Sequence, residues 1–169
     1  PSDKPFSALS AGTRKKLAFA AALSHGAKLL LLDEATAGLD PIVRDDILTL
    51  LMDFTRDDTH AVLLSSHIVS DLEKACDYIA LLHEGRLLLC DEKDRLLERF
   101  GLLCGDAGTL AAVPPAAVRG RRDTPYGSEL LVERALLPAR LPAAPVGVED
   151  LFILLAKEVD GSCVAYADC

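Results

Sequence analysis

The pattern of apolar and polar residues predicts helices alternating with short buried strands in the first half of the chain. Residues 29–32 are four consecutive leucines that run into two carboxylates and a turn-rich stretch, and 60–66 is a second apolar run. Such runs are typical of strands buried on both faces, although a buried helix segment has the same signature. Helical patterns at about 11–25, 41–56 and 68–76 flank the runs, which predicts an α/β fold with parallel strands.

Shorter elements are predicted beyond this region. Apolar residues on both sides of a polar turn that contains Gly85 predict a β-hairpin over 78–91. Residues 94–100 have the spacing of a short amphipathic helix, and Gly101 is expected to end that helix.

Alanine, proline and glycine become frequent after this helix. Two extended pieces around 124–127 predict a second hairpin, and 148–159 has the apolar face of a closing helix. We therefore expect two domains: 1–101, which contains the parallel strands, and 102–169, a small α+β extension.

Composition limits the classes of function. The hydrophobic fraction of 50% argues for a folded chain, and no apolar stretch reaches the roughly 18 residues of a membrane-spanning helix. The formal net charge of −8 argues against nucleic-acid binding, which needs a basic face, although Arg14, Lys15 and Lys16 form a local basic spot.

The cysteines and the first residue bear on the origin of the chain. The cysteines are odd in number and have no CxxC spacing, so neither a disulfide framework nor a zinc site is predicted, and a reducing cytoplasm is expected. Cys76, Cys90 and Cys104 lie beside apolar residues and are expected to be buried. Because the chain begins with Pro1, we interpret it as a processed or excised piece.

Candidate chemistry lies where the leucine run ends. Asp33 and Glu34 follow it, at the strand end where open parallel sheets bind ligands. Mg²⁺ prefers carboxylate oxygens, so Asp33 is a candidate metal ligand, and Glu34 is a candidate general base for the water that attacks a nucleoside triphosphate. The alternative is a strand that simply ends on polar residues.

Two further positions are candidates for phosphate contacts. Ser10 and Gly12 lie at the expected start of the first helix, where free N–H groups favour an anion and glycine allows close approach. An ordinary helix cap is the alternative there. His67 follows the second strand and is expected near the carboxylates, although a lone histidine is more often structural.

Three motifs in this order, LSAGT, LLLLDEATAGLDP and LLSSH, resemble those of the ATP-binding-cassette (ABC) ATPases. The resemblance covers about residues 6–89 and identifies the signature loop, the Walker B strand, the D-loop and the switch histidine, at 9–13, 29–34, 37–40 and His67. It implies ATP and Mg²⁺ as cofactors. The site residues that it implies are Glu34 and His67 for catalysis, Asp33 for the metal, and Ser10, Ala11, Gly12 and Asp40 for nucleotide binding.

The sequence departs from the family pattern in two ways. Ala11 stands where the family most often has glycine, and Thr13 stands where glutamine is common. In addition, the 169 residues contain no GxxxxGK[ST] phosphate loop and no glutamine loop before the signature. The chain thus resembles the C-terminal part of a P-loop NTPase domain, and we expect weak or absent ATP turnover by the chain alone.

The resemblance implies the ATPase subunit of a bacterial ABC transporter, at the cytoplasmic face of the cell membrane. Its implied partners are a second nucleotide-binding domain and a separate transmembrane permease, and no nucleic acid is expected. The stretches TPYGSELLV and GVEDLFILLAKEV look like the C-terminal extension of exporter subunits. One alternative is a truncated, non-hydrolytic protein that lends its signature helix to a complete subunit. Another is a DNA-repair or chromosome-maintenance ATPase, although sustained coiled-coil heptads are missing.

Overall fold

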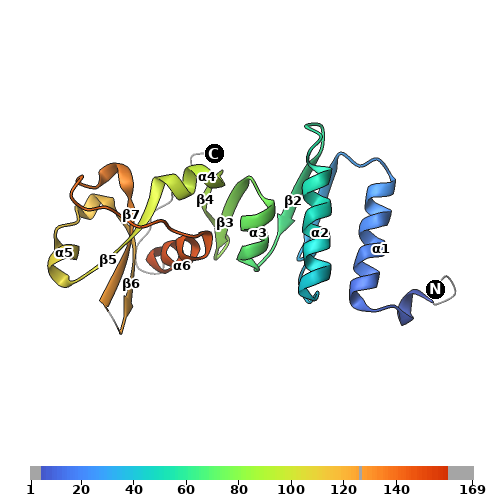
Figure 1. Cartoon of the computed structure of the whole chain (residues 1–169), viewed down its shortest axis with the longest axis horizontal. Helices are drawn as coiled ribbons and strands as arrows, with labels where there is room; N and C mark the ends of the chain where they lie inside the picture. Colours follow the sequence, from blue (N-terminus) through green and yellow to red (C-terminus); the bar gives the residue numbers. More distant parts are fainter. Residues whose placement is uncertain (1–4, 126, 160–169) are drawn as a thin grey trace. The chain divides into compact units, whose positions relative to one another are not determined.

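The computed structural model of the protein describes residues 5–125 and 127–159 and has an α/β architecture (Figure 1). Its contacts divide the chain into two compact units, Pro1–Ala75 and Cys76–Cys169, and each is described by itself. The composition changes between residues 101 and 102 instead. The domain boundary predicted there therefore stays a prediction.

The N-terminal unit contains two parallel strands and the helices around them (Figure 1). Its elements are the 3-10 turn η1 (Phe6–Ala8), α1 (Ala11–Ser24), β1 (Leu29–Asp33), α2 (Pro41–Phe54), β2 (Ala61–Ser65) and α3 (Val69–Ala75). The register of β1 on β2 runs from Leu29 opposite Ala61 to Asp33 opposite Ser65. The predicted order of elements and the parallel pairing are confirmed.

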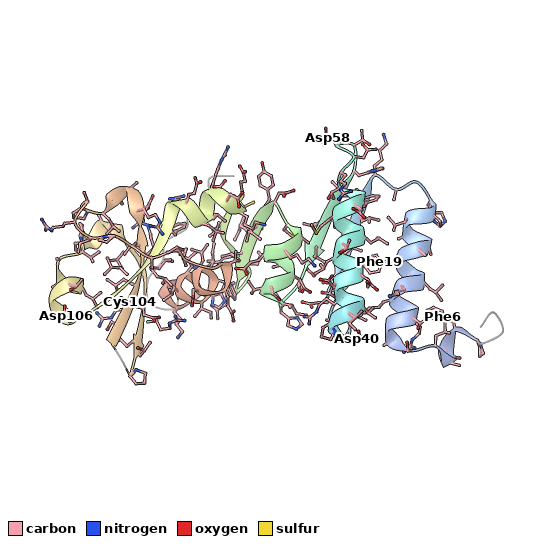
Figure 2. The ribbon with its side chains drawn as sticks, in the orientation of Figure 1. Phe6, Phe19, Asp40, Asp58, Cys104 and Asp106 are labelled. Atoms are coloured by element: carbon pink, nitrogen blue, oxygen red, sulfur yellow. The ribbon has the colours of Figure 1, made fainter. Side chains whose placement is uncertain are left out.

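Helices α1 and α2 cover one face of the β1–β2 pair. Phe19 of α1 packs with Ile47 and Leu51 of α2 and with Leu30 of β1, and all four are buried. Figure 2 shows Phe19 on the side of α1 that faces α2. This cluster holds the two helices against the sheet through the burial of apolar surface.

The opposite face of the β1–β2 pair is open in the part of the chain that the structure describes. Leu29, Leu31 and Leu63 are 56%, 68% and 67% exposed. Successive side chains of a strand point to opposite faces, and α1 and α2 cover only one of them. The prediction that these strands are buried on both faces is therefore wrong for the described residues.

The C-terminal unit contains a hairpin and a three-stranded sheet. Its elements are β3 (Tyr78–His83), β4 (Arg86–Glu92), α4 (Lys93–Arg99), β5 (Phe100–Gly105), α5 (Ala107–Ala111), η2 (Pro115–Ala117), β6 (Val118–Thr124), β7 (Gly127–Glu133), η3 (Arg134–Leu136) and α6 (Val148–Val159). Glu84 and Gly85 connect β3 and β4 with φ angles of 47° and 74°, the left-handed conformation of a tight hairpin turn. Both predicted hairpins and the closing helix are confirmed.

Gly101 has a different role from the predicted one. It lies inside β5, and a Cβ at this position would be 2.7 Å from the Cβ of Ala143 and 2.9 Å from the guanidinium of Arg134. Arg134 donates hydrogen bonds to the carbonyls of Phe100, Ala143 and Ala144 at 2.8, 2.7 and 2.8 Å. The expectation that Gly101 ends a helix is therefore wrong: a glycine fits here because two segments approach the strand closely.

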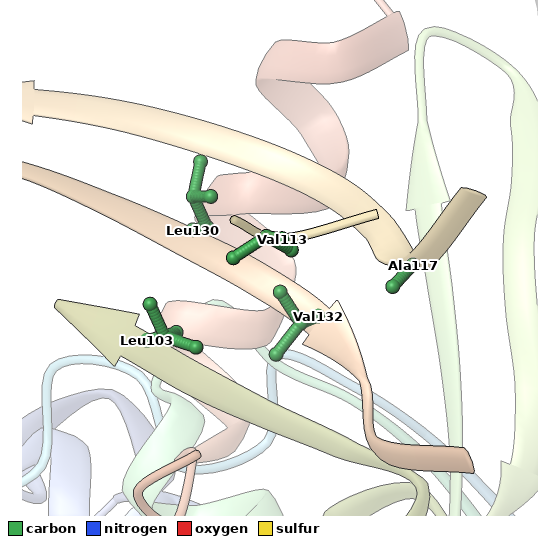
Figure 3. Close-up of a cluster of buried hydrophobic side chains, with 5 residues drawn as sticks. All are labelled: Leu103, Val113, Ala117, Leu130 and Val132. Carbon is green, nitrogen blue, oxygen red and sulfur yellow. The ribbon is translucent and has the colours of Figure 1, made fainter. Parts of the chain in front are cut away.

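The sheet β5–β7–β6 is covered on both faces. On one face, buried side chains from β5, β7 and the 113–117 segment form the cluster in Figure 3: Leu103, Val113, Ala117, Leu130 and Val132. On the other face, α6 packs so closely that a Cβ on Gly120 would be 2.6 Å from the carbonyl oxygen of Leu154. Leu131 pairs with Gly120 in the register, shares this face and is fully buried. Both faces thus contribute to the core of this unit.

Polar contacts fix the helices of this unit. Arg122 of β6 forms ion pairs with Glu129 at 2.5 Å and with Asp150 of α6 at 3.0 Å. The hydrogen bond that Arg122 donates to Glu129 is the main cause that raises the pKa of Arg122. Asp106 caps α5 by accepting from the Thr109 amide at 2.8 Å. That hydrogen bond and the Thr109 hydroxyl lower the pKa of Asp106.

The cysteines are only partly as expected. Cys76 and Cys90 are partly buried, and burial raises the pKa of the Cys76 thiol. Cys104 is exposed, so its predicted burial is wrong: it lies near the end of β5, opposite Glu129, where the sheet ends. Cys163 and Cys169 lie outside the described residues. Within 5–125 and 127–159, no helix combines the length and the apolar character needed to cross a membrane.

Candidate functional site

The carboxyl ends of β1 and β2 bring Asp33 and Ser65 together. These residues are opposite one another in the parallel register, and the Ser65 hydroxyl donates to Oδ1 of Asp33 at 2.5 Å. A short hydrogen bond to an ionised carboxylate is stronger than one between neutral groups. Ser65 therefore fixes the orientation of the Asp33 carboxylate at the edge of the sheet.

Glu34 is the next residue and is held by the same strand. Its amide donates to the carbonyl and the hydroxyl of Ser65 at 3.2 and 3.1 Å, and its φ of 46° is left-handed. His67 lies beside it, with Nδ1 2.7 Å from Oε2 of Glu34. The side chains of His67 and Glu34 are 73% and 41% exposed. The structure thus brings Asp33, Glu34 and His67 to one accessible place, as their positions in the sequence predicted.

This group suits a metal that arrives with a phosphate ligand. In the described ranges, no three His, Cys, Asp or Glu side chains are arranged to hold a metal ion. Mg²⁺ commonly uses one or two carboxylates and takes its other ligands from water and substrate phosphates. The Asp33 carboxylate fits such a site as a single protein ligand.

The start of α1 forms a second group. Ser10 caps the helix: its hydroxyl oxygen accepts from the Thr13 amide at 3.2 Å and lies 2.8 Å from the Thr13 hydroxyl. Ala11 and Gly12 are the first two helical residues. A Cβ on Gly12 would meet Val43 at 3.6 Å, an ordinary contact, so packing within the chain does not require glycine here.

Asp40 lies at the start of α2 (Figure 2). Its Oδ1 accepts from the Val43 amide at 3.0 Å, so the carboxylate serves as the helix cap, and Pro41 occupies the first turn. Leu39, next to Asp40, is the other neighbour of Gly12, with a Cβ-to-Cδ2 distance of 3.9 Å. Because its neighbour Leu39 lies beside Gly12, Asp40 belongs to the second group, at the start of α1. Asp33, Glu34 and His67 form the first group.

Replacing Asp40 by alanine is expected to lower the free energy of unfolding of the N-terminal unit by about 1 kcal/mol, because the Val43 amide loses its acceptor. Urea unfolding of the chain, followed by circular dichroism, measures this change. Asp40→Asn is the matched control, since its amide oxygen can cap the helix. If Asp40→Asn loses as much stability as Asp40→Ala, the negative charge of Asp40, and not its hydrogen bond to the Val43 amide, stabilises the unit.

Two residues of this region were not singled out from the sequence. Ser65 had a recognisable signal, because it stands two positions before His67 at the end of a strand expected to neighbour β1. Lys15 was noted only as part of a basic spot, yet its ammonium reaches the carbonyls of Glu34 and Ala37. Only the folded arrangement of α1 and the loop after β1 shows that contact.

Comparison with protein families and curated proteins gives matches to part of the chain. The family model described as "AAA domain, putative AbiEii toxin, Type IV TA system" matches residues 4–70. The bacitracin transport ATP-binding protein BcrA of Enterococcus faecalis is 39% identical over 85 residues, which are 50% of this chain and 28% of that protein. The uncharacterized ABC transporter ATP-binding protein YhcH of Bacillus subtilis is 44% identical over 79 residues, 47% of this chain and 26% of that protein.

Two further comparisons have similar coverage. The methionine import ATP-binding protein MetN 1 of Yersinia pestis is 40% identical over 92 residues, 54% of this chain and 26% of that protein. Among solved structures, cbiO1 from Clostridium perfringens, part of the ABC transporter complex cbiONQ, is 32% identical with a TM-score of 0.49, and the match covers 57% of this chain and 38% of that one. The chain spans about a quarter of the length of the curated relatives named here.

Proposed function

We propose that this chain, a homologue of the ATP-binding proteins of ABC transporters, supplies the signature helix, the Walker B carboxylates, the D-loop and the switch histidine of a transport ATPase. The proposed partners are a second nucleotide-binding domain and a transmembrane permease, at the cytoplasmic face of the membrane. Export is part of the proposal only through the resemblance of the C-terminal stretches to exporter subunits. The names of the relatives include both bacitracin transport and methionine import.

The first group of residues would act on the terminal phosphate of ATP. Mg²⁺, when bound with ATP, neutralises phosphate charge, and Asp33 would be its protein ligand. Glu34 would accept a proton from the attacking water, as a carboxylate within reach of that water can. His67 would hold the Glu34 carboxylate in place through the contact between Nδ1 and Oε2 and present its other ring nitrogen to the phosphate.

The second group would act on a nucleotide held by the opposite protomer. The start of α1 has free backbone N–H groups at the positive end of the helix dipole. Ser10 would add its hydroxyl, and Ala11 and Gly12 would let a phosphate oxygen approach the backbone. Asp40 lies beside this surface and would contact the nucleotide or the facing protomer from the D-loop.

One observation carries the proposal. The 2.7 Å contact of His67 with Glu34 joins residues from the ends of two neighbouring parallel strands, beside an Asp33 carboxylate oriented by Ser65. An ordinary polar strand end provides no reason for a second carboxylate and an imidazole to converge on the first. A water-activating carboxylate beside a metal ligand, with an imidazole to orient it, accounts for this arrangement.

A complete subunit that contains this chain is expected to hydrolyse ATP, whereas the 169-residue chain alone is expected to release no more phosphate than its own Glu34→Gln variant. The reason is that these residues include no phosphate loop to hold the triphosphate against Glu34. Phosphate release in the presence of Mg²⁺ and ATP measures both rates. Glu34-dependent phosphate release by the chain alone would show that residues other than a phosphate loop bind ATP. An inactive complete subunit would refute the proposed ATPase function.

A further inference from the structure

Lys15 connects α1 to the loop that follows β1. Its Nζ donates to the carbonyl of Ala37 at 2.6 Å and to that of Glu34 at 3.3 Å, and both contacts are partly buried. An ammonium has three N–H donors, so one lysine can hold two carbonyls together. This side chain thereby joins the second turn of α1 to the residue proposed as the catalytic base.

The backbone of Glu34 needs such support. A left-handed conformation is strained for a non-glycine residue, because it brings the Cβ close to the following carbonyl oxygen, and Glu34 has a φ of 46°. The amide of Glu34 donates to Ser65. The carbonyl of Glu34 accepts from the Ala37 amide at 3.2 Å and from Lys15. Glu34 is therefore fixed at both ends, which sets the direction of its side chain towards His67.

Side-chain packing gives only part of this support. Ala35 and Leu39 of the loop pack against the buried cluster around Phe19, and Thr36 is fully buried. An open cleft of about 300 Å³ lies beside Lys15 and Glu34, so the start of the loop is packed on one side only. The hydrogen bonds of Lys15 therefore add to apolar packing in setting the position of Glu34 relative to α1.

We propose that Lys15 is a positioning residue that holds the backbone of Glu34 in a fixed place relative to the signature helix. The inference rests on the proposed ATPase function, in which Glu34 is the base and the start of α1 meets a nucleotide. Lys15 itself touches no substrate: it acts through the carbonyls of Glu34 and Ala37.

Lys15→Met in the complete subunit tests this role, because methionine keeps an unbranched apolar stem and removes the donors. We expect kcat for ATP hydrolysis to fall about 10- to 100-fold, since small misplacements of a reacting group have effects of this order. KM for ATP should stay within about twofold, because ground-state binding is unaffected. Lys15→Arg, which can donate to both carbonyls, should recover most of the rate.

Lys16→Met is the matched control. Lys16 is the neighbouring cation of α1, and it pairs with Asp46 at 2.8 Å on the surface, where both side chains are about half exposed. Its replacement should leave kcat near the parental value. Hydrogen exchange of the Ala37 amide, which donates to Glu34, gives a second measurement: it should become faster in Lys15→Met and stay unchanged in Lys16→Met.

The outcomes separate this inference from the proposed function. An inactive parental subunit, or a Glu34→Gln variant as active as the parent, rejects the ATPase itself. An active, Glu34-dependent subunit whose Lys15→Met variant has the parental kcat rejects only the role of Lys15, as does a loss of kcat that Lys15→Arg does not recover. If Lys15→Met does not fold, Lys15→Gln, whose amide can donate to one carbonyl, is measured by the same criteria.

Discussion

Replacing Glu34 by glutamine in the complete subunit is expected to slow ATP hydrolysis by about 10²- to 10⁴-fold, the usual contribution of a general base. Glutamine has nearly the same shape, and its side-chain oxygen can still lie near Nδ1 of His67. It cannot take a proton from water at neutral pH. ATP binding should therefore persist while turnover is lost, and phosphate release together with binding of labelled ATP measures the two separately.

Glu98→Gln is the matched control for this substitution. Glu98 is an exposed glutamate of α4 and has no place in either group of candidate residues. Its variant should hydrolyse ATP at the parental rate. A Glu34→Gln subunit with the parental rate would remove Glu34 as the base, and an equal loss in Glu98→Gln would point to an unspecific effect of losing a carboxylate.

Replacing Leu154 by alanine is expected to destabilise the C-terminal unit by about 2–5 kcal/mol, as for other buried leucines. Leu154 is fully buried in α6, and its carbonyl oxygen is the atom that Gly120 of β6 approaches. The backbones are already so close that the sheet has little freedom to move into the vacated volume. Urea unfolding of the chain, followed by circular dichroism, should show the transition of this unit at a lower urea concentration.

Leu82→Ala provides the comparison, because Leu82 is a leucine of the same unit that is 67% exposed in β3. Its replacement should change the free energy of unfolding by no more than about 0.5 kcal/mol. Equal losses for Leu82 and Leu154 would contradict the burial of α6 against the sheet. A loss restricted to Leu154→Ala would support α6 as the element that closes this unit.

The parallel strands were predictable because their signal is local. The leucines of β1 and the apolar run of β2 are bounded by turn-forming residues, so their positions follow from short stretches of sequence. The exposure of Leu29 and Leu31 was not predictable in this way, because an apolar run does not show whether the chain contains an element for each face. The strand β5 was not predicted either, because its short apolar run follows directly on α4 without a turn between them.

Long-range contacts explain the other differences. Gly101 follows a helical pattern and so resembles a helix end, but its neighbours Arg134 and Ala143 lie more than 30 positions further along. In the candidate site, the positions of Asp33, Glu34 and His67 at the ends of two neighbouring strands indicated their proximity. The contribution of Lys15 depends on carbonyl oxygens 19 and 22 residues away, which carry no sequence signal of their own.

The hydrogen bond between Ser65 and Asp33 has a consequence for the order of folding. It joins residues 32 positions apart, and it requires the crossover through α2 to be complete. Contacts of this separation form after local helices, because the chain must first lose the entropy of a large loop. We therefore expect the aspartate to be oriented after the local helices form, so an emerging polypeptide with its helices already formed would still lack the arrangement needed for chemistry.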